Sequence, residues 1–527
     1  MQKQCGHEGA CACQVSDTAG QAQAFAPHPF PAQGTPGPPA WAAAPPRRKG
    51  RRTLFAVLGV LVVAVVVAAT AVVTLQFSGD DAAGAVPVAA NGAPAPAGPP
   101  ATPAGPAPAN AAAAGPRSIG DGNLREGAVY VQSNDETANE VVAFARKQDG
   151  TLREVGRYPT GGTGTGSFED SAQGIVLGTS EAEASPIQNV DRAELLFVAN
   201  AGSGSISVFR VQESGLELVG QTPSGGKRPV SLTVNRGLLY VLNSGEEDRR
   251  LILGPTSALE NCGHGDLPSV TGFRVGPDGV LQAIEDSTRQ LSGRARSGCA
   301  QVSFTPDGRT LVVSERIASL PGQAKEGKGA FDLFDVRYDG TLGRKQQVDP
   351  SGAGPFGFNF TKDGKLVSSE QNGGLANPGG GHAATYEITG DRTLKAVNGS
   401  VSNAQTDSCW VAITDDQKFA FVSSPFNGGI ISSYRLGADG SLTLAQPVAT
   451  APDGKDANND VVGEGTTDMT LSRDSQFLYQ LNSFTGSLWV FKVGAEGLLS
   501  FVEQHQVFQL QPFGKGGEAA PFGIAAF

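Results

Sequence analysis

From about Ile119 onward the chain repeats one short pattern, and this repetition limits the possible folds more than any other feature. In each repeat an apolar strand ends in a small polar residue, a Gly/Ser/Asn loop follows, a second strand ends in an aromatic residue, and a Gly turn leads to a last strand. The first of these strands occurs seven times, at residues 128–134, 196–200, 239–243, 311–315, 366–370, 419–424 and 477–482. Period-2 strands without an amphipathic helix, repeated at this spacing, predict an all-β fold built of seven similar sheets.

The ends of the repeat array indicate how the sheets are closed into a ring. Every unit after the first is preceded by one more apolar strand, at residues 174–177, 230–234, 301–304, 356–360, 410–413 and 468–471. The first unit lacks this strand, but the segment 521–524 (Pro-Phe-Gly-Ile) near the end of the chain matches residues 355–358 (Pro-Phe-Gly-Phe). We therefore predict a seven-bladed β-propeller over residues 118–527, in which the C-terminal strand completes blade 1 and leaves no exposed sheet edge.

Upstream of the propeller the chain predicts a membrane anchor. Residues 53–77 carry no charge and are mostly Val, Ala and Leu, and as a helix rising ~1.5 Å per residue they exceed the ~30 Å hydrocarbon core of a bilayer. Basic residues cluster at 47–52, and the next one is Arg117. The positive-inside rule then predicts a single-pass helix with a cytoplasmic tail (1–52) and a periplasmic or extracellular propeller.

Two further features belong to this N-terminal part. Arg51-Arg52 before the apolar run also fits a cleaved twin-arginine export signal, which would export the same domain, but the length of the run favours a retained anchor. Residues 78–117 are nearly all Ala, Pro and Gly, so they have too little apolar bulk to fold. We expect them to be an extended linker.

The cytoplasmic tail also contains a compact group of soft-metal ligands: Cys5, His7, Cys11 and Cys13. These residue types bind Zn or Cu(I), although their spacing matches no standard zinc finger. Free reactive thiols or a lipidation site are the alternatives. For the propeller itself the sequence predicts no cofactor.

Net charge argues against nucleic acid as a partner. The chain has a formal net charge of −11, and the basic excess is confined to residues 1–52, which carry six basic and two acidic side chains. Nucleic-acid binding needs a basic surface that displaces counterions from phosphates. We therefore expect a small molecule or a cell-surface ligand, together with the membrane, as the partners of this protein.

The loops of the predicted propeller fall into two classes. Short hairpins with Asp-Gly turns occupy one face, at residues 149–150, 307–308, 339–340, 363–364 and 439–440. The long insertions 244–270, 316–330, 371–383 and 452–466 all belong to the opposite face. Long loops gathered on one face of a rigid scaffold are where ligands usually bind.

Breaks in the sevenfold pattern supply the candidate catalytic residues. At the end of the second strand the seven repeats carry Asn134, Asn200, Asn243, Glu315, Glu370, Ser424 and Asn482. Asn suits the start of a loop, but two carboxylates in neighbouring blades resemble an acid/base pair, because like charges held together raise one pKa. The alternative is that Glu315 and Glu370 are solvated and paired with Arg316.

Other candidates lie on the innermost strands and in the loops of the same face. Gln301, Trp410 and Asp468 replace small residues where the funnel narrows, and they either contact a ligand or fill the channel and hydrogen-bond each other. His264 and His382 lie in long loops and are candidate general bases. Arg228 and Arg316 are candidates for binding a substrate carboxylate, since the guanidinium matches it in shape. Surface pairing is the alternative for Arg228.

Three cysteines fall in the propeller: Cys262, Cys299 and Cys409. In an oxidising compartment we predict a Cys262–Cys299 disulfide, because both residues belong to the loop face of blades 3 and 4. Cys409 lies two blades further round the ring and is predicted to be free, either as a small buried residue or as a nucleophile.

The repeats, with the phrases FVAN, FTPDGRTLVVSE, SSYRLGADGSLTL and CWVAIT, resemble the bacterial lactonase-type seven-bladed propellers (6-phosphogluconolactonase/carboxymuconate cyclase-like, with YVTN-like repeats). The resemblance implies a lactone hydrolase or cycloisomerase that acts at the funnel mouth on a small lactone, either sugar-derived or carboxylated. Glu315 or Glu370 would then be the general base, and Arg228, Arg316 or a His would polarise the carbonyl. A non-catalytic binding or scaffold module at the cell surface is the alternative.

Overall fold

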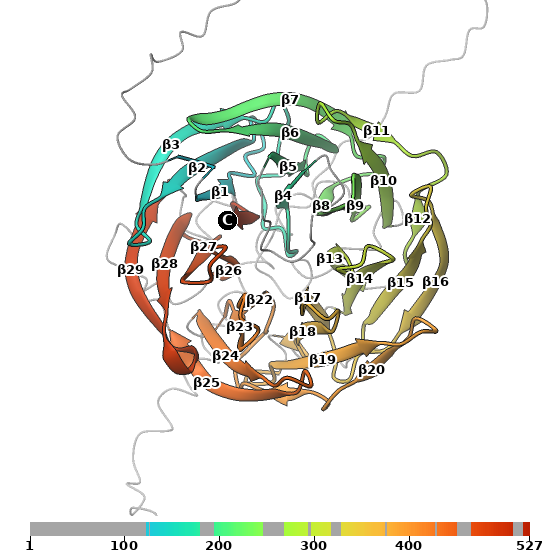
Figure 1. Cartoon of the computed structure of the whole chain (residues 1–527), viewed down its shortest axis with the longest axis vertical. Coiled ribbons are helices and arrows are strands. Elements are labelled where there is room, and N and C mark those ends of the chain that lie inside the picture. The colour runs from blue at the N-terminus through green and yellow to red at the C-terminus, as the bar shows by residue number, and fades with distance from the viewer. Residues whose placement is uncertain are drawn as a thin grey trace, which may run out of the picture. The chain divides into compact units, whose positions relative to one another are not determined.

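Seven β-sheets arranged around a central axis make up the folded part of the chain (Figure 1). The computed structural model describes residues 123–125, 127–179, 194–245, 268–292, 297–317, 328–374, 377–426, 429–450, 465–509 and 520–527. Each sheet is one blade of antiparallel strands, with its innermost strand next to the axis. The predicted all-β seven-bladed propeller is therefore confirmed.

Blades 1 and 2 comprise, from the axis outward, β30 (Ile524–Ala526), β1 (Ala128–Gln132), β2 (Glu140–Arg146) and β3 (Leu152–Pro159), then β4 (Ile175–Gly178), β5 (Leu195–Asn200), β6 (Ser205–Gln212) and β7 (Gly215–Pro223). Blades 3 and 4 comprise β8 (Pro229–Asn235), β9 (Leu238–Asn243), β10 (Ser269–Val275), β11 (Leu281–Ala283) and β12 (Arg289–Gln290), then β13 (Ser297–Phe304), β14 (Thr310–Ile317), β15 (Ala330–Val336) and β16 (Leu342–Val348).

Blade 5 comprises β17 (Pro355–Phe360), β18 (Leu366–Glu370), β19 (His382–Ile388), β20 (Leu394–Ala396) and β21 (Val401–Ser402). Blades 6 and 7 comprise β22 (Val411–Ile413), β23 (Phe419–Ser424), β24 (Ile430–Leu436) and β25 (Leu442–Thr450), then β26 (Thr466–Leu471), β27 (Phe477–Asn482), β28 (Ser487–Val493), the short 3-10 helix η2 (Ala495–Gly497) and β29 (Leu499–Gln506). In blades 3 and 5 the outermost strand is split into two short ones that both pair with the third strand.

The ring closes as the sequence predicts. Strand β30 pairs antiparallel with β1, so that Val129 lies opposite Ala526 and Val131 lies opposite Ile524. Because the last strand of the chain completes the first blade, residues almost 400 positions apart share one sheet. Blade 1 consequently holds the two ends of the ring together.

The core lies between neighbouring blades. All five residues of β1 are buried, because the sheet is covered by a blade on either side. One face of blade 1 packs Tyr130 with Leu196 of blade 2, and the other packs Val129 with Tyr479 of blade 7. The outer strand β3 instead alternates between half-buried and exposed residues, as expected at the rim.

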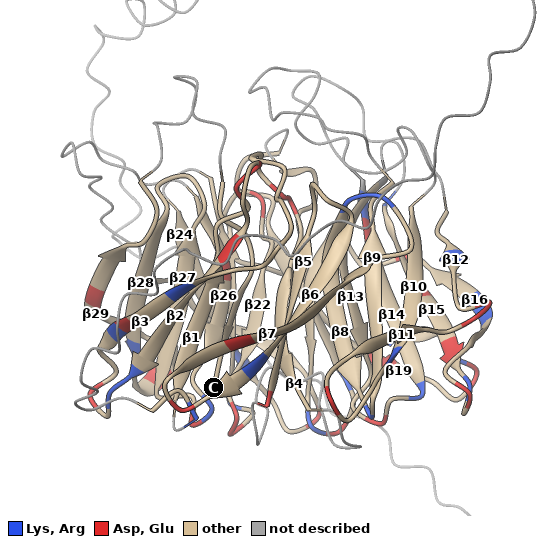
Figure 2. Cartoon of the chain, turned by 90° about the horizontal axis from the view of Figure 1, so that it is seen from above, with Lys and Arg blue, Asp and Glu red and all other residues tan. Residues whose placement is uncertain are grey.

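The two faces of the ring carry different connections. On one face the Asp-Gly hairpins form tight turns, and the glycines of the five predicted pairs have φ between 66° and 88°, which side chains disfavour. In blades 4 to 7 an Asp carboxylate caps the inner hairpin by accepting from a preceding hydroxyl, as Asp307 does from Thr305 Oγ1 at 2.7 Å. Figure 2 shows many of the charged residues gathered in these turns along the lower edge.

Apart from the connection from β4 to β5, the long connections leave the opposite face, which we call the loop face. The connection from β3 to β4 lies on it, as do the predicted insertions, which themselves fall largely outside the described residues. None of the helical turns in the described part of the chain has the length and apolar character that a membrane crossing requires. The predicted tail (1–52), anchor (53–77) and linker (78–117) lie outside the described residues, and so remain predictions.

Candidate functional site

Among the described residues, one segment of chain crosses the centre of the ring on the loop face. Residues 165–173, in the connection from β3 to β4, have no regular secondary structure, and we call them the plug. Their hydrogen bonds reach four blades: Asn134 Nδ2 to Ser167 O (2.8 Å), Ser171 Oγ to Val230 O (2.9 Å), Ala172 N to Ala300 O (2.9 Å) and Trp410 Nε1 to Ser171 O (3.0 Å). The plug is therefore anchored to blades 1, 3, 4 and 6 at once.

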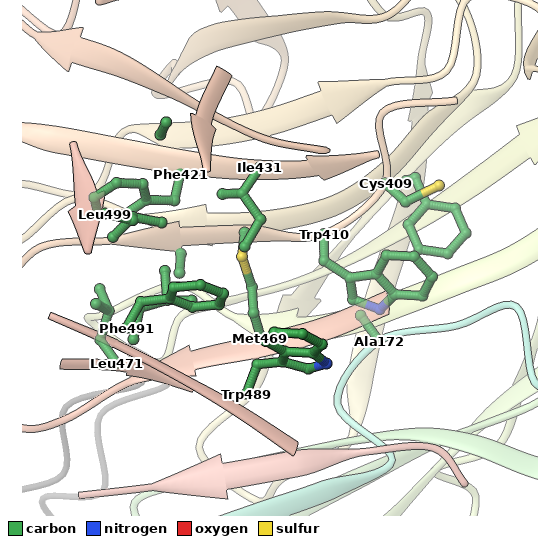
Figure 3. Packing of buried hydrophobic residues seen from close by; sticks show 14 of the residues in the cluster. Ala172, Cys409, Trp410, Phe421, Ile431, Met469, Leu471, Trp489, Phe491 and Leu499 are labelled. Atoms are coloured by element: carbon green, nitrogen blue, oxygen red, sulfur yellow. The ribbon is translucent and has the colours of Figure 1, made fainter. Parts of the chain in front are cut away.

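The plug also takes part in the largest hydrophobic cluster. Phe168 packs edge-on against Phe484 of blade 7, with ring centroids 5.4 Å apart. Figure 3 shows Ala172 next to Trp410, with Cys409 on the other side of the indole. Trp410 packs in turn against Phe356 of blade 5, at a centroid distance of 5.0 Å. The funnel is consequently filled by side chains at this level.

The three residues predicted to line the funnel lie in this filled region. Gln301 bridges two blades, since its Nε2 donates to Phe358 O (2.7 Å) and its Oε1 accepts from Phe358 N (2.9 Å). Asp468 accepts from the backbone N–H of Met469 (3.0 Å), and burial raises the pKa of this carboxyl to about 7. Trp410 is hydrogen-bonded to the plug. The geometry therefore favours the alternative that Gln301, Trp410 and Asp468 fill the channel. Ligand binding by these three residues remains a prediction.

The plug presents one carboxylate to blade 3. Glu169 forms a two-pronged ion pair with Arg228, with Nε–Oε2 at 3.0 Å and Nη2–Oε1 at 3.3 Å. Both side chains are almost fully buried, at 4% and 2% exposure, and Thr165 Oγ1 also donates to Glu169. Arg228 adopts a left-handed backbone (φ 52°) that aims it at the plug. The guanidinium predicted to hold a substrate carboxylate thus holds a carboxylate of the protein itself.

The next plug residue presents a second carboxylate to blade 4. Arg316 Nη2 lies 2.5 Å from Asp170 Oδ2, and its guanidinium stacks 5.8 Å from the centre of the Phe356 ring. Asp407, before β22, interacts with the same pair. Burial, together with the charge of Asp170, raises the pKa of Asp407 to about 7, and burial also raises the pKa of Asp170.

The two predicted catalytic carboxylates are buried and have separate partners. Glu315 accepts from Ser292 N (3.1 Å) and Ser292 Oγ (2.5 Å), and it adjoins Asp332, whose pKa burial and Glu315 raise to about 7. Glu370 accepts from Tyr386 Oη (2.6 Å), Gly352 N (3.0 Å) and Ser400 Oγ. Because each carboxylate has its own set of hydrogen-bond donors, this geometry gives no support to a shared acid/base pair.

The remaining predicted residues divide between described and undescribed parts of the chain. His382 is half-buried at the start of β19, opposite Glu370, and its Nδ1 contacts Gly380 O at 2.6 Å. Cys299 is disulfide-bonded, and Cys409 is free and buried. His264, Cys262 and the N-terminal group of Cys5, His7, Cys11 and Cys13 lie outside the described residues. The Cys262–Cys299 pairing and the Zn or Cu(I) site therefore remain predictions, and the described residues hold no other cluster of metal ligands.

An open pocket lies beside the plug on the loop face. It has a volume of about 570 Å³ and is formed by the connections β1–β2, β3–β4, β5–β6 and β7–β8. Its walls carry hydroxyl groups, backbone atoms of several glycines and three charged side chains, namely Glu136, Lys227 and Arg228. Arg228 and Thr165 line the pocket, and both also contact the buried Glu169.

Three acidic residues that contact Arg228 or Arg316 were not among the sequence candidates: Glu169, Asp170 and Asp407. The available signal was the β3–β4 connection itself, which is long for a propeller and carries two adjacent carboxylates after an aromatic residue. Asp407 gave no local signal, because its importance comes from contacts with Asp170 and Arg316, which are distant in sequence.

Comparison with known proteins agrees with this architecture. Residues 105–252 match the family model described as lactonase, 7-bladed beta-propeller. The fold is similar to a candidate 6-phosphogluconolactonase of Bacteroides fragilis (TM-score 0.53, 14% identity, covering 78% of this chain and 100% of that one). It is also similar to a periplasmic gluconolactonase of Pseudomonas aeruginosa (TM-score 0.51, 15% identity, covering 76% and 98%).

A third similar structure, a hypothetical selenium-binding protein of Sulfolobus tokodaii (TM-score 0.50, 11% identity, covering 76% and 93%), has the same architecture under a different description. At such identities a structural likeness establishes the fold and leaves the substrate open. The match over residues 105–252 and the ring closed by its C-terminal strand show a seven-bladed β-propeller that is similar to the lactonase-type propellers.

Proposed function

We propose that this protein opens a small lactone in the pocket beside the plug. The observation that carries the proposal is the position of Arg228, which lines an open polar pocket while Glu169 holds its guanidinium in place through two hydrogen bonds. A fixed cation is what lactone hydrolysis needs, since negative charge develops on the carbonyl oxygen as water attacks. The family match supports the same reaction class.

The residues of the pocket can be given roles in this reaction. Arg228, with Lys227 beside it, would stabilise the oxyanion that forms when water adds to the lactone carbonyl. Glu136 lines the same pocket and is exposed, so it is our choice for the general base that takes a proton from water and returns one to the ring oxygen as the C–O bond breaks. Glu315 and Glu370 do not line this pocket.

The walls of the pocket support a polar substrate. Thr163, Thr165 and Ser203 contribute hydroxyl groups, and the small Ala201 is the apolar side chain among the lining residues. Hydroxyl and backbone groups of this kind bind a sugar-derived or carboxylated lactone better than one with a long acyl chain, because an acyl chain gains little from polar walls. The periplasmic gluconolactonase among the similar structures agrees with this choice.

The test is turnover of a panel of aldono-, γ- and δ-lactones by the purified chain and four variants. We expect Glu136→Gln to lower kcat by roughly 10²–10⁴-fold, the usual contribution of a general base. Arg228→Lys keeps the charge but loses the two-pronged pairing with Glu169, and should also lower turnover. Glu315→Gln and the exposed-carboxylate control Glu154→Gln should retain activity, as judged by initial rates and circular dichroism.

Two results of that experiment would reject the assignment. Turnover lost in Glu315→Gln but kept in Glu136→Gln would move the base to blade 4. An absence of turnover on every lactone by a well-folded chain would favour the second candidate function, a binding or scaffold module. A specific observation supports that second candidate: the plug fills the funnel, and both Glu315 and Glu370 are engaged in internal hydrogen bonds.

We further propose that the propeller is displayed outside the cytoplasm on a single-pass anchor. The uncharged run at 53–77, the basic cluster before it and the Pro/Ala-rich linker after it support this arrangement. Protease added to intact cells or spheroplasts should release the propeller and leave an epitope placed in residues 1–52 protected. A mature chain that starts after residue 77 would instead indicate a cleaved export signal, and a propeller found in the cytoplasm would overturn the proposal.

A further inference from the structure

We infer that the plug is a pH-operated latch, which closes the centre of the ring while one of Asp170 and Asp407 is protonated and loosens when both are ionised. The inference concerns the buried centre of the ring and does not depend on the reaction proposed for the neighbouring pocket. It rests on how the plug is held, on which charges face each other beneath it, and on what the plug covers.

The plug is held by isolated hydrogen bonds and ion pairs rather than by a β-ladder, and its backbone is strained at the points where it is held. No β-ladder includes residues 165–173, and the bonds to blades 1, 3, 4 and 6 are isolated ones. Three residues that hold it have left-handed φ angles although none is glycine: Gln173 (64°), Arg228 (52°) and Asp407 (63°). Such conformations persist only where the surroundings enforce them, and segments of this kind open before the blades unfold.

The charges beneath the plug do not balance once every acid is ionised. From the plug, Glu169 and Asp170 face inward; Arg228 comes from the start of blade 3, Arg316 from β14, and Asp407 from the segment before β22. Among the described residues, Arg228 neutralises Glu169, and Arg316 is the cation that interacts with both Asp170 and Asp407. The Cys409 thiol and the neutral amide of Gln371 are the other groups that face Asp407.

The sign of the pH effect follows from this arrangement. Burial, then Asp170, raises the pKa of Asp407 to about 7, and burial raises the pKa of Asp170 as well. Raised pKa values mean that the closed state retains a proton that the open, hydrated state would release, so closure is most favourable at low pH. As the pH rises through about 7, a second negative charge forms next to the first, and closure becomes less favourable.

A built-in reporter lies next to Trp410, the residue of blade 6 that contacts the plug. Cys409 is fully buried beside Trp410, whose indole N–H donates to the plug at Ser171 O. Burial and the two aspartates raise the pKa of this thiol, so it reacts slowly unless the plug opens. Alkylation of Cys409 therefore measures opening directly, without any substrate.

The experiment follows alkylation of Cys409 in the full chain by peptide-level mass spectrometry. The rate for the urea-unfolded chain is divided by the rate for the folded chain at the same pH, which removes the intrinsic ionisation of the thiol and gives a protection factor. We expect this factor to fall about tenfold between pH 6 and pH 8.5. A tenfold change is what a shift of one pKa unit between the closed and the open state produces. Asp407→Asn should keep high protection at both pH values, because the site can then carry only one acidic charge.

A matched control separates the latch from global stability. Asp332 is also buried with a pKa raised to about 7, but its partners Glu315, Gln347 and Lys345 lie in blade 4 and its neighbouring loop, away from the plug. Asp332→Asn should therefore leave the pH dependence of Cys409 protection unchanged. Equal loss of the pH dependence in Asp332→Asn and Asp407→Asn would overturn the proposal.

Two other outcomes would also overturn it: a protection factor that does not change with pH, and one that changes in step with hydrogen exchange of the core strands β1 and β2. If Asp407→Asn does not fold, hydrogen exchange of the wild-type chain decides the question. Residues 165–173, corrected for intrinsic exchange, should then lose protection between pH 6 and pH 8.5 while β1 and β2 retain theirs; equal behaviour of the two regions rejects the latch.

Discussion

Removal of residues 521–527 is expected to abolish cooperative folding of the propeller. This segment contains β30, which pairs with β1 and is the innermost strand of blade 1. Phe522, Ile524 and Phe527 are each at most 5% exposed. Burial of three such side chains stabilises by about 5–9 kcal/mol, which approaches the whole stability of a typical domain.

Two further effects make the expected loss of stability larger than the loss of side-chain burial alone. Without β30 the backbone of β1 loses its inner partner, because Phe527 N donates to Ala128 O at 3.1 Å in the closed ring. The freed edge of β1 is long, apolar and able to pair with other chains. We therefore expect loss of the sigmoidal thermal transition, together with aggregation, measured by circular dichroism and light scattering.

The control is a chain in which residues 521–527 are replaced by a Gly/Ser segment of equal length, which tests the strand sequence rather than the chain length. It should behave as the deletion does, whereas the single change Ile524→Ala should lower the free energy of unfolding by only about 2–4 kcal/mol. A truncated chain that keeps the wild-type transition temperature would show that the ring does not depend on this closure.

The second large effect is expected from Arg316→Met. Arg316 is fully buried between Asp170 and Phe356, and its removal leaves two carboxylates, Asp170 and Asp407, without their cation. Removing one partner of a buried pair costs about 3–5 kcal/mol, because the remaining charge is neither hydrated nor paired. We expect a loss of this size in the free energy of unfolding at pH 8.

The destabilisation expected for Arg316→Met should depend on pH. At pH 5 the two acids, whose pKa values burial raises, are increasingly protonated, so the missing cation matters less and the loss should shrink. Arg309→Met is the matched control: Arg309 pairs with Asp307 at 3.9 Å on the surface, and such pairs contribute at most about 1 kcal/mol. Urea unfolding at the two pH values measures both variants, and a loss that is the same at pH 5 and pH 8 would contradict the electrostatic account.

The blades could be predicted because their signals are local. Alternating apolar residues and an aromatic residue at the end of the third strand recur seven times, Asp-Gly turns recur in several blades, and each signal depends on neighbours within a few residues. The closure by β30 was also predictable, since residues 521–524 repeat a motif that opens another blade. Repetition supplies several independent observations of the same unit, which is why a single sequence was sufficient.

The candidate site was less predictable, because its residues act through partners that are distant in sequence. The ring position of Glu315 and Glu370 was correctly read as a break in the repeat, but the repeat did not indicate that Ser292 and Tyr386 donate hydrogen bonds to these carboxylates. Arg228 was singled out as a carboxylate binder, and the structure places a carboxylate on it, that of Glu169. Nothing near Arg228 in the sequence indicates that partner.

The sequence by itself therefore determined the seven blades, their hairpins and the strand that closes the ring. Only the tertiary structure decided that residues 165–173 cross the centre and that Asp170 and Asp407 share Arg316. The physical reason is the range of the interactions. Strand and turn formation depends on spacing along the chain, whereas the pairing of buried charges depends on which side chains the closed ring brings within a few ångströms of each other.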